Sequence, residues 1–161
     1  MLKQKSLAKL LPLTVAAAGF FATAAVADVA PSDVVIVDDN EIPQALTDTA
    51  GDAAKGRELA VNRKKGNCLA CHVMPIDEHG FHGEVGPSLW GVGGNYSAAE
   101  LRLRVVNYKV LNEDVIMPAF YVNSNKMHRV LKKFEDKTLL SAQEVEDIVA
   151  YLQTLTEEQP D

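Results

Sequence analysis

The pattern of apolar and polar positions predicts three helices separated by long irregular stretches. The first covers residues 52–62, where small and apolar residues recur at helical spacing. Asp52 is suited to cap its first turn, since its side chain can accept hydrogen bonds from free backbone N–H groups. We expect the helix to end at Gly66, because glycine commonly follows a last helical turn.

Two further helices begin with capping boxes, in which a serine and a glutamate three residues later satisfy each other's backbone N–H groups. The first box opens at Ser97 and the second at Ser141. Apolar residues follow at helical spacing in both, namely Leu101, Val105, Tyr108 and Leu111, then Val145, Ile148, Val149, Leu152 and Leu155. Gly56 inside the first helix indicates close packing, for which Tyr151 or Leu152 is the predicted contact.

Residues 74–95 are rich in glycine and predict a loop. A loop of this length is uncommon in a compact domain unless it encloses something other than helices and strands. No convincing strand pattern, internal repeat or low-complexity tract appears elsewhere. The sequence therefore predicts an all-α domain whose loop wraps round a cofactor.

The beginning of the chain has the features of a secretory signal peptide over residues 1–27. Three lysines precede an apolar, alanine-rich run, and Ala25-Val26-Ala27 forms an A-x-A cleavage site. The alternative is an uncleaved membrane anchor, but the run is barely long enough to span a bilayer and holds Pro12 and Gly19. We expect export to a bacterial periplasm, with no membrane association after cleavage. Residues 28–50 then predict an irregular N-terminal arm, with a disordered leader as the alternative.

The charge of the chain excludes several partners. The sequence has 161 residues with 16 basic and 22 acidic side chains. Removal of residues 1–27 leaves 13 basic against 22 acidic residues in 134 residues, a net charge of −9. This charge argues against binding to nucleic acids or anionic membranes, and it suits a partner with a basic docking face.

The only two cysteines stand in Cys68-Leu69-Ala70-Cys71-His72, the C-x-x-C-H attachment motif of a c-type haem. The spacing lets one turn of chain present both thiols to the two vinyl groups on one porphyrin edge. The histidine that follows is placed to become the proximal iron ligand. A zinc site and a thioredoxin-like redox pair are the alternatives. Zinc would need a second ligand pair, and a thioredoxin-like site would need a preceding strand, and neither is apparent.

A second axial ligand is expected in Val115-Ile116-Met117-Pro118. The proline disfavours helix for the methionine before it, which suits a loop that offers a thioether to iron. Methionine and histidine are a known pair in electron-transfer cytochromes, so we predict His72 and Met117 as axial ligands. A buried core methionine is the alternative interpretation of Met117.

The other candidates for this position have less favourable surroundings. Met74 lies too close to His72 to reach the opposite face of a haem. Met127 and His128 lie among basic residues typical of a solvated surface. His79 and His82 are expected in an exposed, flexible loop, and a bis-histidine haem through His82 is the main alternative.

Residues 86–89 are predicted to lie beside the proximal histidine. Pro87 has no N–H, but its carbonyl can accept the second N–H of a ligating imidazole and fix its orientation. Leu89 and Trp90 are expected to form walls of the haem pocket, with Phe120 and the distal methionine. A plain turn is the alternative reading of residues 86–89.

These motifs resemble class I cytochrome c domains, and their flanks resemble more narrowly the SoxX family, the monohaem subunit of SoxAX cytochromes. The segments that carry the resemblance are Asn67-Cys68-Leu69-Ala70-Cys71-His72, Phe81-His82-Gly83-Glu84-Val85-Gly86-Pro87, Ile116-Met117-Pro118-Ala119-Phe120-Tyr121 and Ala142-Gln143-Glu144-Val145-Glu146-Asp147-Ile148-Val149-Ala150-Tyr151-Leu152. The likeness extends over most of residues 51–155. It implies one cytochrome c domain at 51–157 that carries one covalent haem c.

The resemblance also implies a function in sulfur oxidation. SoxAX is an L-cysteine S-thiosulfotransferase, which couples thiosulfate oxidatively to a cysteine of the carrier SoxYZ. The catalytic haem is expected on a dihaem or monohaem SoxA-like partner, and this chain would accept electrons and pass them to a downstream acceptor. A free-standing periplasmic electron carrier is the alternative. A haem-based sensor or peroxidase would need an open sixth coordination position on the iron. The Met117-Pro118 pair argues against this function, because the methionine is expected to occupy that position.

Overall fold

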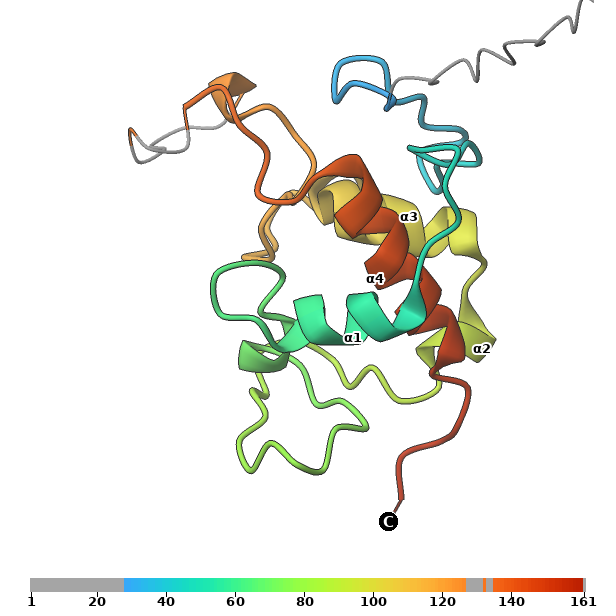
Figure 1. The fold of residues 1–161 in the computed structure, drawn as a ribbon, viewed down its shortest axis with the longest axis vertical. Helices are drawn as coiled ribbons and strands as arrows, with labels where there is room; N and C mark the ends of the chain where they lie inside the picture. The colour runs from blue at the N-terminus through green and yellow to red at the C-terminus, as the bar shows by residue number, and fades with distance from the viewer. Residues whose placement is uncertain (1–27, 127–131, 133–134, 161) are drawn as a thin grey trace, which may run out of the picture.

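The computed structural model describes residues 28–126, 132 and 135–160. The predicted signal peptide and the rival ligands Met127 and His128 lie outside these residues. The helices are α1 (Ala53–Val61), η1 (Cys68–Ala70), α2 (Val92–Asn95), α3 (Ala98–Asn107), η2 (Tyr108–Val110), η3 (Ser124–Lys126) and α4 (Ala142–Thr154) (Figure 1). In the described part of the chain, Val37 and Glu41 form an isolated bridge and no strand is present. The predicted all-α class is confirmed.

Helix α1 starts where its capping residue predicts and ends at Val61, beside the predicted last residue Asn62. The Asp52 carboxylate accepts hydrogen bonds from the backbone N–H groups of Ala54, at 2.9 Å, and Lys55, at 3.3 Å. The prediction that Gly66 ends this helix is wrong. Asn62 already has an extended backbone, and its side chain accepts a hydrogen bond from the Lys64 N–H, so a turn begins there.

Both predicted capping boxes are confirmed. Ser97 and Glu100 cap α3, and Ser141 and Glu144 cap α4, with the reciprocal hydrogen bonds present in each case. These two helices pack on each other, and α1 crosses α4 on another side (Figure 1). Among the described residues, no helix combines the length and hydropathy needed to traverse a bilayer.

The crossing of α1 and α4 depends on Gly56. A Cβ atom at this position would overlap the Asp147 backbone and would lie 2.8 Å from the Tyr151 Cβ. The predicted contact with Tyr151 is confirmed. The Asp147 carboxylate also accepts a hydrogen bond from the Asp52 N–H at 2.8 Å, so the start of α1 is fixed on the side of α4.

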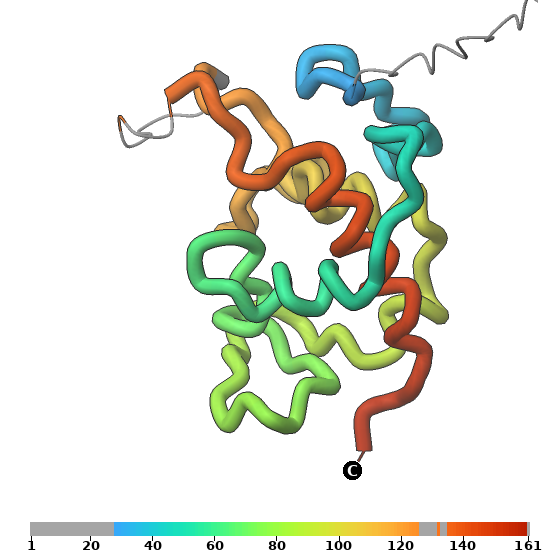
Figure 2. The backbone as a smooth tube through the Cα atoms, viewed as in Figure 1, coloured from blue at the N-terminus to red at the C-terminus, as the bar shows by residue number. Residues whose placement is uncertain are grey.

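The N-terminal residues 28–50 follow the surface of the helical domain at the end away from the loop of residues 74–90 (Figure 2). Ile42 and Leu46 are buried in the core. The Ile42 N–H donates to the carbonyl of Ala99 at 3.1 Å, and the Tyr121 hydroxyl donates to the carbonyl of Val29 at 2.7 Å. The arm is therefore packed against the domain as well as connected to it.

A buried ion pair holds the arm on both long helices. Arg102 of α3 makes a bidentate contact with Glu146 of α4, at 2.7 and 2.9 Å. Arg102 also donates to the carbonyl of Ile42 at 2.7 Å, and Glu146 accepts from the Leu46 N–H at 2.9 Å. Because both charges are buried, these extra hydrogen bonds satisfy groups that would otherwise be costly to bury.

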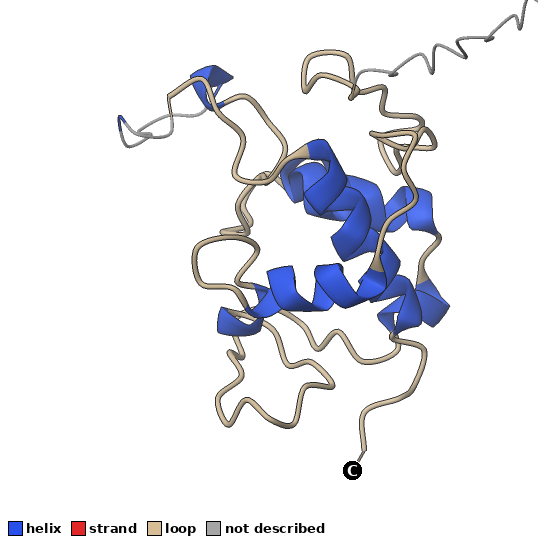
Figure 3. Ribbon diagram, in the orientation of Figure 1, coloured by secondary structure: helices blue, strands red, loops and turns tan. Residues whose placement is uncertain are grey.

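Residues 74–91 form an irregular loop, as predicted (Figure 3). The expectation that this loop continues to residue 95 is wrong, because Val92–Asn95 form α2 despite two central glycines. The Gly93 N–H donates to the carbonyl of Leu155 at 2.8 Å, and a Cβ at Gly93 would lie 2.5 Å from the carbonyl oxygen of Gln153. Close packing against the end of α4 thus accounts for a glycine at this point.

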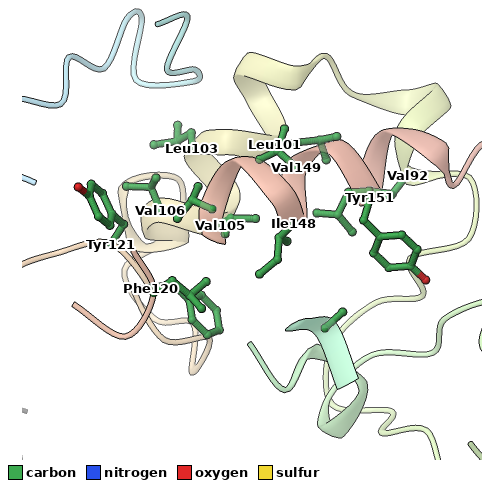
Figure 4. Packing of buried hydrophobic residues seen from close by; sticks show 14 of the residues in the cluster. Val92, Leu101, Leu103, Val105, Val106, Phe120, Tyr121, Ile148, Val149 and Tyr151 are labelled. Carbon is green, nitrogen blue, oxygen red and sulfur yellow. The ribbon is translucent and has the colours of Figure 1, made fainter. Parts of the chain in front are cut away.

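The hydrophobic core lies between α3 and α4 and continues to one side of α4. Ile148 on α4 and Phe120 after the middle helix point toward this side (Figure 4). Both line a cavity, whereas Tyr121 points away from Phe120 toward the arm. The fold therefore divides the apolar interior into a packed part and an open part.

Candidate cofactor site

The open part of the interior is a cavity of about 860 Å³, which falls in the range of cofactor sites. Its walls come from the segment after α1, the loop of residues 85–90, helices α3 and α4, and residues 112–120. All the predicted site residues line it, namely Cys68, Cys71, His72, Pro87, Leu89, Trp90 and Met117. Phe120, predicted as a further wall residue, also lines it.

The two cysteines are placed by the short helix η1. The N–H groups of Cys71 and His72 both donate to the carbonyl of Cys68, at 3.0 Å each. This tight turn puts both thiols on the cavity wall, and neither forms a disulfide. Burial raises the pKa of Cys68, as a free thiol before haem attachment, to about 11.

His72 is oriented by the backbone of Pro87. Its Nδ1 atom lies 2.7 Å from the Pro87 carbonyl oxygen, and because a carbonyl only accepts, Nδ1 carries the hydrogen. The Nε2 atom therefore keeps its lone pair for a metal ion. The structure has the contact that the sequence predicted.

Two backbone hydrogen bonds bring Pro87 to the histidine. The Gly86 N–H donates to the carbonyl of Cys71 at 2.7 Å, and the Leu89 N–H donates to the carbonyl of Val73 at 2.9 Å. Gly86 itself contacts the imidazole so closely that a Cβ would lie 2.6 Å from Nδ1 and 2.8 Å from Nε2. The sequence predicted residues 86–89 beside His72, and the structure adds that Gly86 leaves no room for a Cβ against the ring.

Met117 approaches the cavity from a different part of the chain. It is half-buried on the segment between η2 and the buried residues Ala119 and Phe120. Ile116 beside it exposes 78% of its surface, whereas Met117 packs against the hydrophobic core. A thiol pair, an oriented imidazole and a thioether thus share one cavity, which is the donor set of a c-type haem.

A family model for cytochrome c matches residues 53–156. The chain belongs to the cytochrome c family. It therefore carries covalent haem c on Cys68 and Cys71, and the zinc and thioredoxin alternatives are excluded. Within the described residues, no group of three His, Cys, Asp or Glu side chains is placed to hold a metal ion.

A solved structure shows a more specific similarity of this cytochrome within its family. The chain is 34% identical to a chain of the crystal structure of SoxXA from P. pantotrophus, with a TM-score of 0.74. The match covers 81% of this cytochrome and 100% of that chain. The resemblance to SoxX seen in the sequence is confirmed by it. No curated protein matches the sequence.

The structure of the cytochrome also changes the interpretation of His82. Its Nδ1 accepts a hydrogen bond from the Met74 N–H at 3.2 Å, and its Nε2 lies 3.1 Å from the carbonyl oxygen of Ile76. The prediction of an exposed, mobile patch is wrong for this residue, which is half-buried and organises the loop. Because both ring nitrogens are engaged and His82 does not line the cavity, the bis-histidine alternative loses its support.

A cation on the cavity wall of the cytochrome was not predicted. The Arg104 guanidinium lies 3.9 Å from the ring centroid of Tyr96 and donates to the Glu100 carbonyl at 3.0 Å. Both Arg104 and Tyr96 line the cavity. Stacking fixes this positive charge on the cavity wall.

Proposed function

We propose that this cytochrome is the electron-accepting subunit of a SoxAX-type L-cysteine S-thiosulfotransferase. The observation that carries the proposal is the match to a chain of the SoxXA structure, which covers 81% of this cytochrome and 100% of that chain, together with the haem-binding motif and Met117 on one cavity. In the reaction, a sulfur–sulfur bond forms between thiosulfate and the cysteine of a SoxYZ-like carrier. The thiol proton and two electrons leave, and the electrons must reach an acceptor.

The axial ligands in this proposal are His72 and Met117. The haem supplies one-electron chemistry at its iron. The Pro87 carbonyl holds the proton on Nδ1 of His72 and keeps the ring in one orientation. A thioether is a soft ligand that favours ferrous iron and raises the reduction potential relative to two histidines.

Ligation on both faces suits electron transfer rather than substrate binding. Leu89, Trp90 and Phe120 lie on the cavity wall and give it an apolar lining. With His72 on one face and Met117 on the other, no position is left for a substrate. The bond-forming chemistry therefore belongs to a SoxA-like dihaem or monohaem partner, and this chain passes electrons to a downstream acceptor.

The surface at the cavity mouth suits a protein partner. Val85 and Ile116 both line the cavity and expose 65% and 78% of their surfaces. Apolar side chains in such positions favour a desolvated contact close to the haem. Export through residues 1–27 would place the complex in the periplasm, where thiosulfate and the carrier meet it.

Co-purification with a SoxA-like chain tests the proposal. Both chains are produced in a host that attaches haem, and haem reduction is followed after addition of thiosulfate and carrier. We expect a stable heterodimer in which this haem is reduced only when the partner is present. A monomer that ignores the partner, yet exchanges electrons with periplasmic acceptors, would support the alternative of a free-standing carrier.

A further inference from the structure

The segment that presents Met117 is anchored unequally at its two ends. After the methionine, Ala119, Phe120 and Tyr121 are buried, and the Tyr121 N–H donates to the carbonyl of Val106 on α3 at 3.2 Å. Before it, residues 112–114 and 116 are exposed, and Val115 is only half-buried. The approach to Met117 therefore has little apolar contact with the rest of the protein, and its apolar residues Val115 and Ile116 line the cofactor cavity.

The local backbone contacts of this approach are short-range. The Asn112 side chain accepts a hydrogen bond from the Asp114 N–H at 3.0 Å, and the Val115 N–H lies 3.5 Å from the Asn112 carbonyl. These bonds form a turn, and the Asn112 N–H, which donates to the carbonyl of Tyr108 at 3.2 Å, joins its first residue to η2. They do not hold the later residues 113–116 on the helix. A turn held in this way opens easily unless a second element holds it.

Lys109 attaches the later part of the turn to η2. It follows α3 on η2, and its ammonium group donates to the carbonyl oxygens of Val115 at 2.7 Å and Glu113 at 3.3 Å. The Asn107 side chain accepts a hydrogen bond from the Lys109 N–H and helps to place it. A charged donor makes stronger hydrogen bonds than a neutral one, so one exposed lysine joins the turn to the end of the helix.

We propose that Lys109 is a positioning residue that keeps the Met117 thioether in place on the iron. The inference rests on the proposed role of Met117 as axial ligand. An iron–thioether bond competes with external ligands, and the loop must be ordered for the bond to form. By holding the turn two residues before Met117, Lys109 reduces the entropy lost when the bond forms.

Two features separate this role from that of a general surface charge. The ammonium group contacts backbone carbonyls, so the contact fixes main-chain position rather than neutralising a carboxylate. In addition, the contact attaches a segment whose side chains contribute little burial. Loss of the contact should release the methionine without unfolding the domain, whose core lies elsewhere.

Imidazole binding to the ferric, haem-loaded protein tests the proposal. Imidazole takes the sixth position only when Met117 leaves, so its affinity measures how firmly the thioether is held. We expect Lys109→Ala to raise the imidazole affinity by about tenfold, as loss of a charge-assisted hydrogen bond implies. Lys109→Arg keeps the donors and should retain an affinity near that of the wild type. Lys64→Ala, which removes an exposed ammonium from another loop, should leave the affinity unchanged.

Hydrogen exchange over residues 112–118 provides a second measurement. Lys109→Ala should exchange faster there, while α1 and α4 keep their protection. Unchanged imidazole affinity in Lys109→Ala, in a protein whose far-red haem–methionine band disappears in Met117→Ala, would overturn the role of Lys109 and leave that of Met117 intact. Persistence of the band in Met117→Ala would overturn both.

Discussion

The imidazole of His72 donates its Nδ1 hydrogen to the carbonyl oxygen of Pro87 across 2.7 Å. The bond requires Pro87 to approach from the loop of residues 74–91, which the Gly86 N–H secures by donating to the carbonyl of Cys71. A proline is well suited to this place, because it offers an acceptor and no competing donor. The relationship links a residue in the haem-attachment motif to a loop that follows fifteen residues later.

Gly86→Ala should disturb this histidine. A methyl group at residue 86 would overlap the imidazole, so the ring or the loop must move. We expect a lower yield of haem-loaded protein and a loss of stability of about 1–3 kcal/mol, as for overpacked core sites. Haem content per chain and urea unfolding measure the two effects. Gly80→Ala is the matched control, since nothing lies within 4 Å of a Cβ at Gly80. Equal behaviour of the two variants would contradict the prediction.

Met117→Ala should open the sixth coordination position. We expect the ferric protein to lose the weak far-red band of haem–methionine ligation, and its reduction potential to fall as the soft ligand is replaced. Absorption spectra and redox titration measure the changes. Met74→Leu is the control, because Met74 is fully buried and does not line the cavity. A far-red band that survives Met117→Ala would show that another residue ligates the iron.

Arg102→Ala should be among the most destabilising single substitutions. It leaves the buried Glu146 carboxylate without its charge partner and the Ile42 carbonyl without its donor. Breaking one partner of a buried pair costs about 3–5 kcal/mol, which urea unfolding of the haem-loaded protein would detect. The double variant Arg102→Leu/Glu146→Leu should recover part of this loss, because no isolated charge remains buried. A loss below about 1 kcal/mol in the single variant would mean that the pair is unimportant, since exposed pairs contribute no more than this.

The capping box of α3 should make stability depend on pH. A hydrogen bond from the Ser97 backbone N–H, with the Ser97 side chain and Asn40, holds the pKa of Glu100 below its ordinary value of 4.5. A carboxylate with a lowered pKa stabilises the folded state above the unfolded pKa, and this contribution disappears as the pH falls through the folded pKa. Thermal unfolding should therefore show a lower Tm for Glu100→Gln at neutral pH and a smaller difference below pH 4.5.

The exposed Glu58 on α1 provides the control for this experiment. Glu58→Gln removes one negative charge from a helix without touching a capping residue. A Tm difference for Glu100→Gln that stays constant from neutral to acidic pH would show that the charged form of Glu100 does not stabilise the fold.

Local chemistry made several features predictable from the sequence. Asp52, Ser97 and Ser141 start helices where predicted, because a capping side chain acts on backbone groups two or three residues away. The haem-attachment motif is equally local, since both thiols must reach one porphyrin edge within a single turn. Contacts between distant segments left weaker signals. The Gly56 contact was predicted only because glycine destabilises the interior of a helix and therefore indicates close packing against another element.

The sequence by itself determined where α1, α3 and α4 begin, the attached haem and the family, since short-range hydrogen bonding and covalent chemistry depend on neighbours in the chain. Only the tertiary structure decided that His82 organises a loop rather than facing the cavity, because that depended on which backbone groups reached its two nitrogens. The tertiary structure also decided the hydrogen-bond partners of Lys109 and the pairing of Arg102 with Glu146, because packing brings these groups together. Polar and charged side chains of this kind have many possible hydrogen-bond partners along the chain, and the folded structure brings only some of these partners within reach.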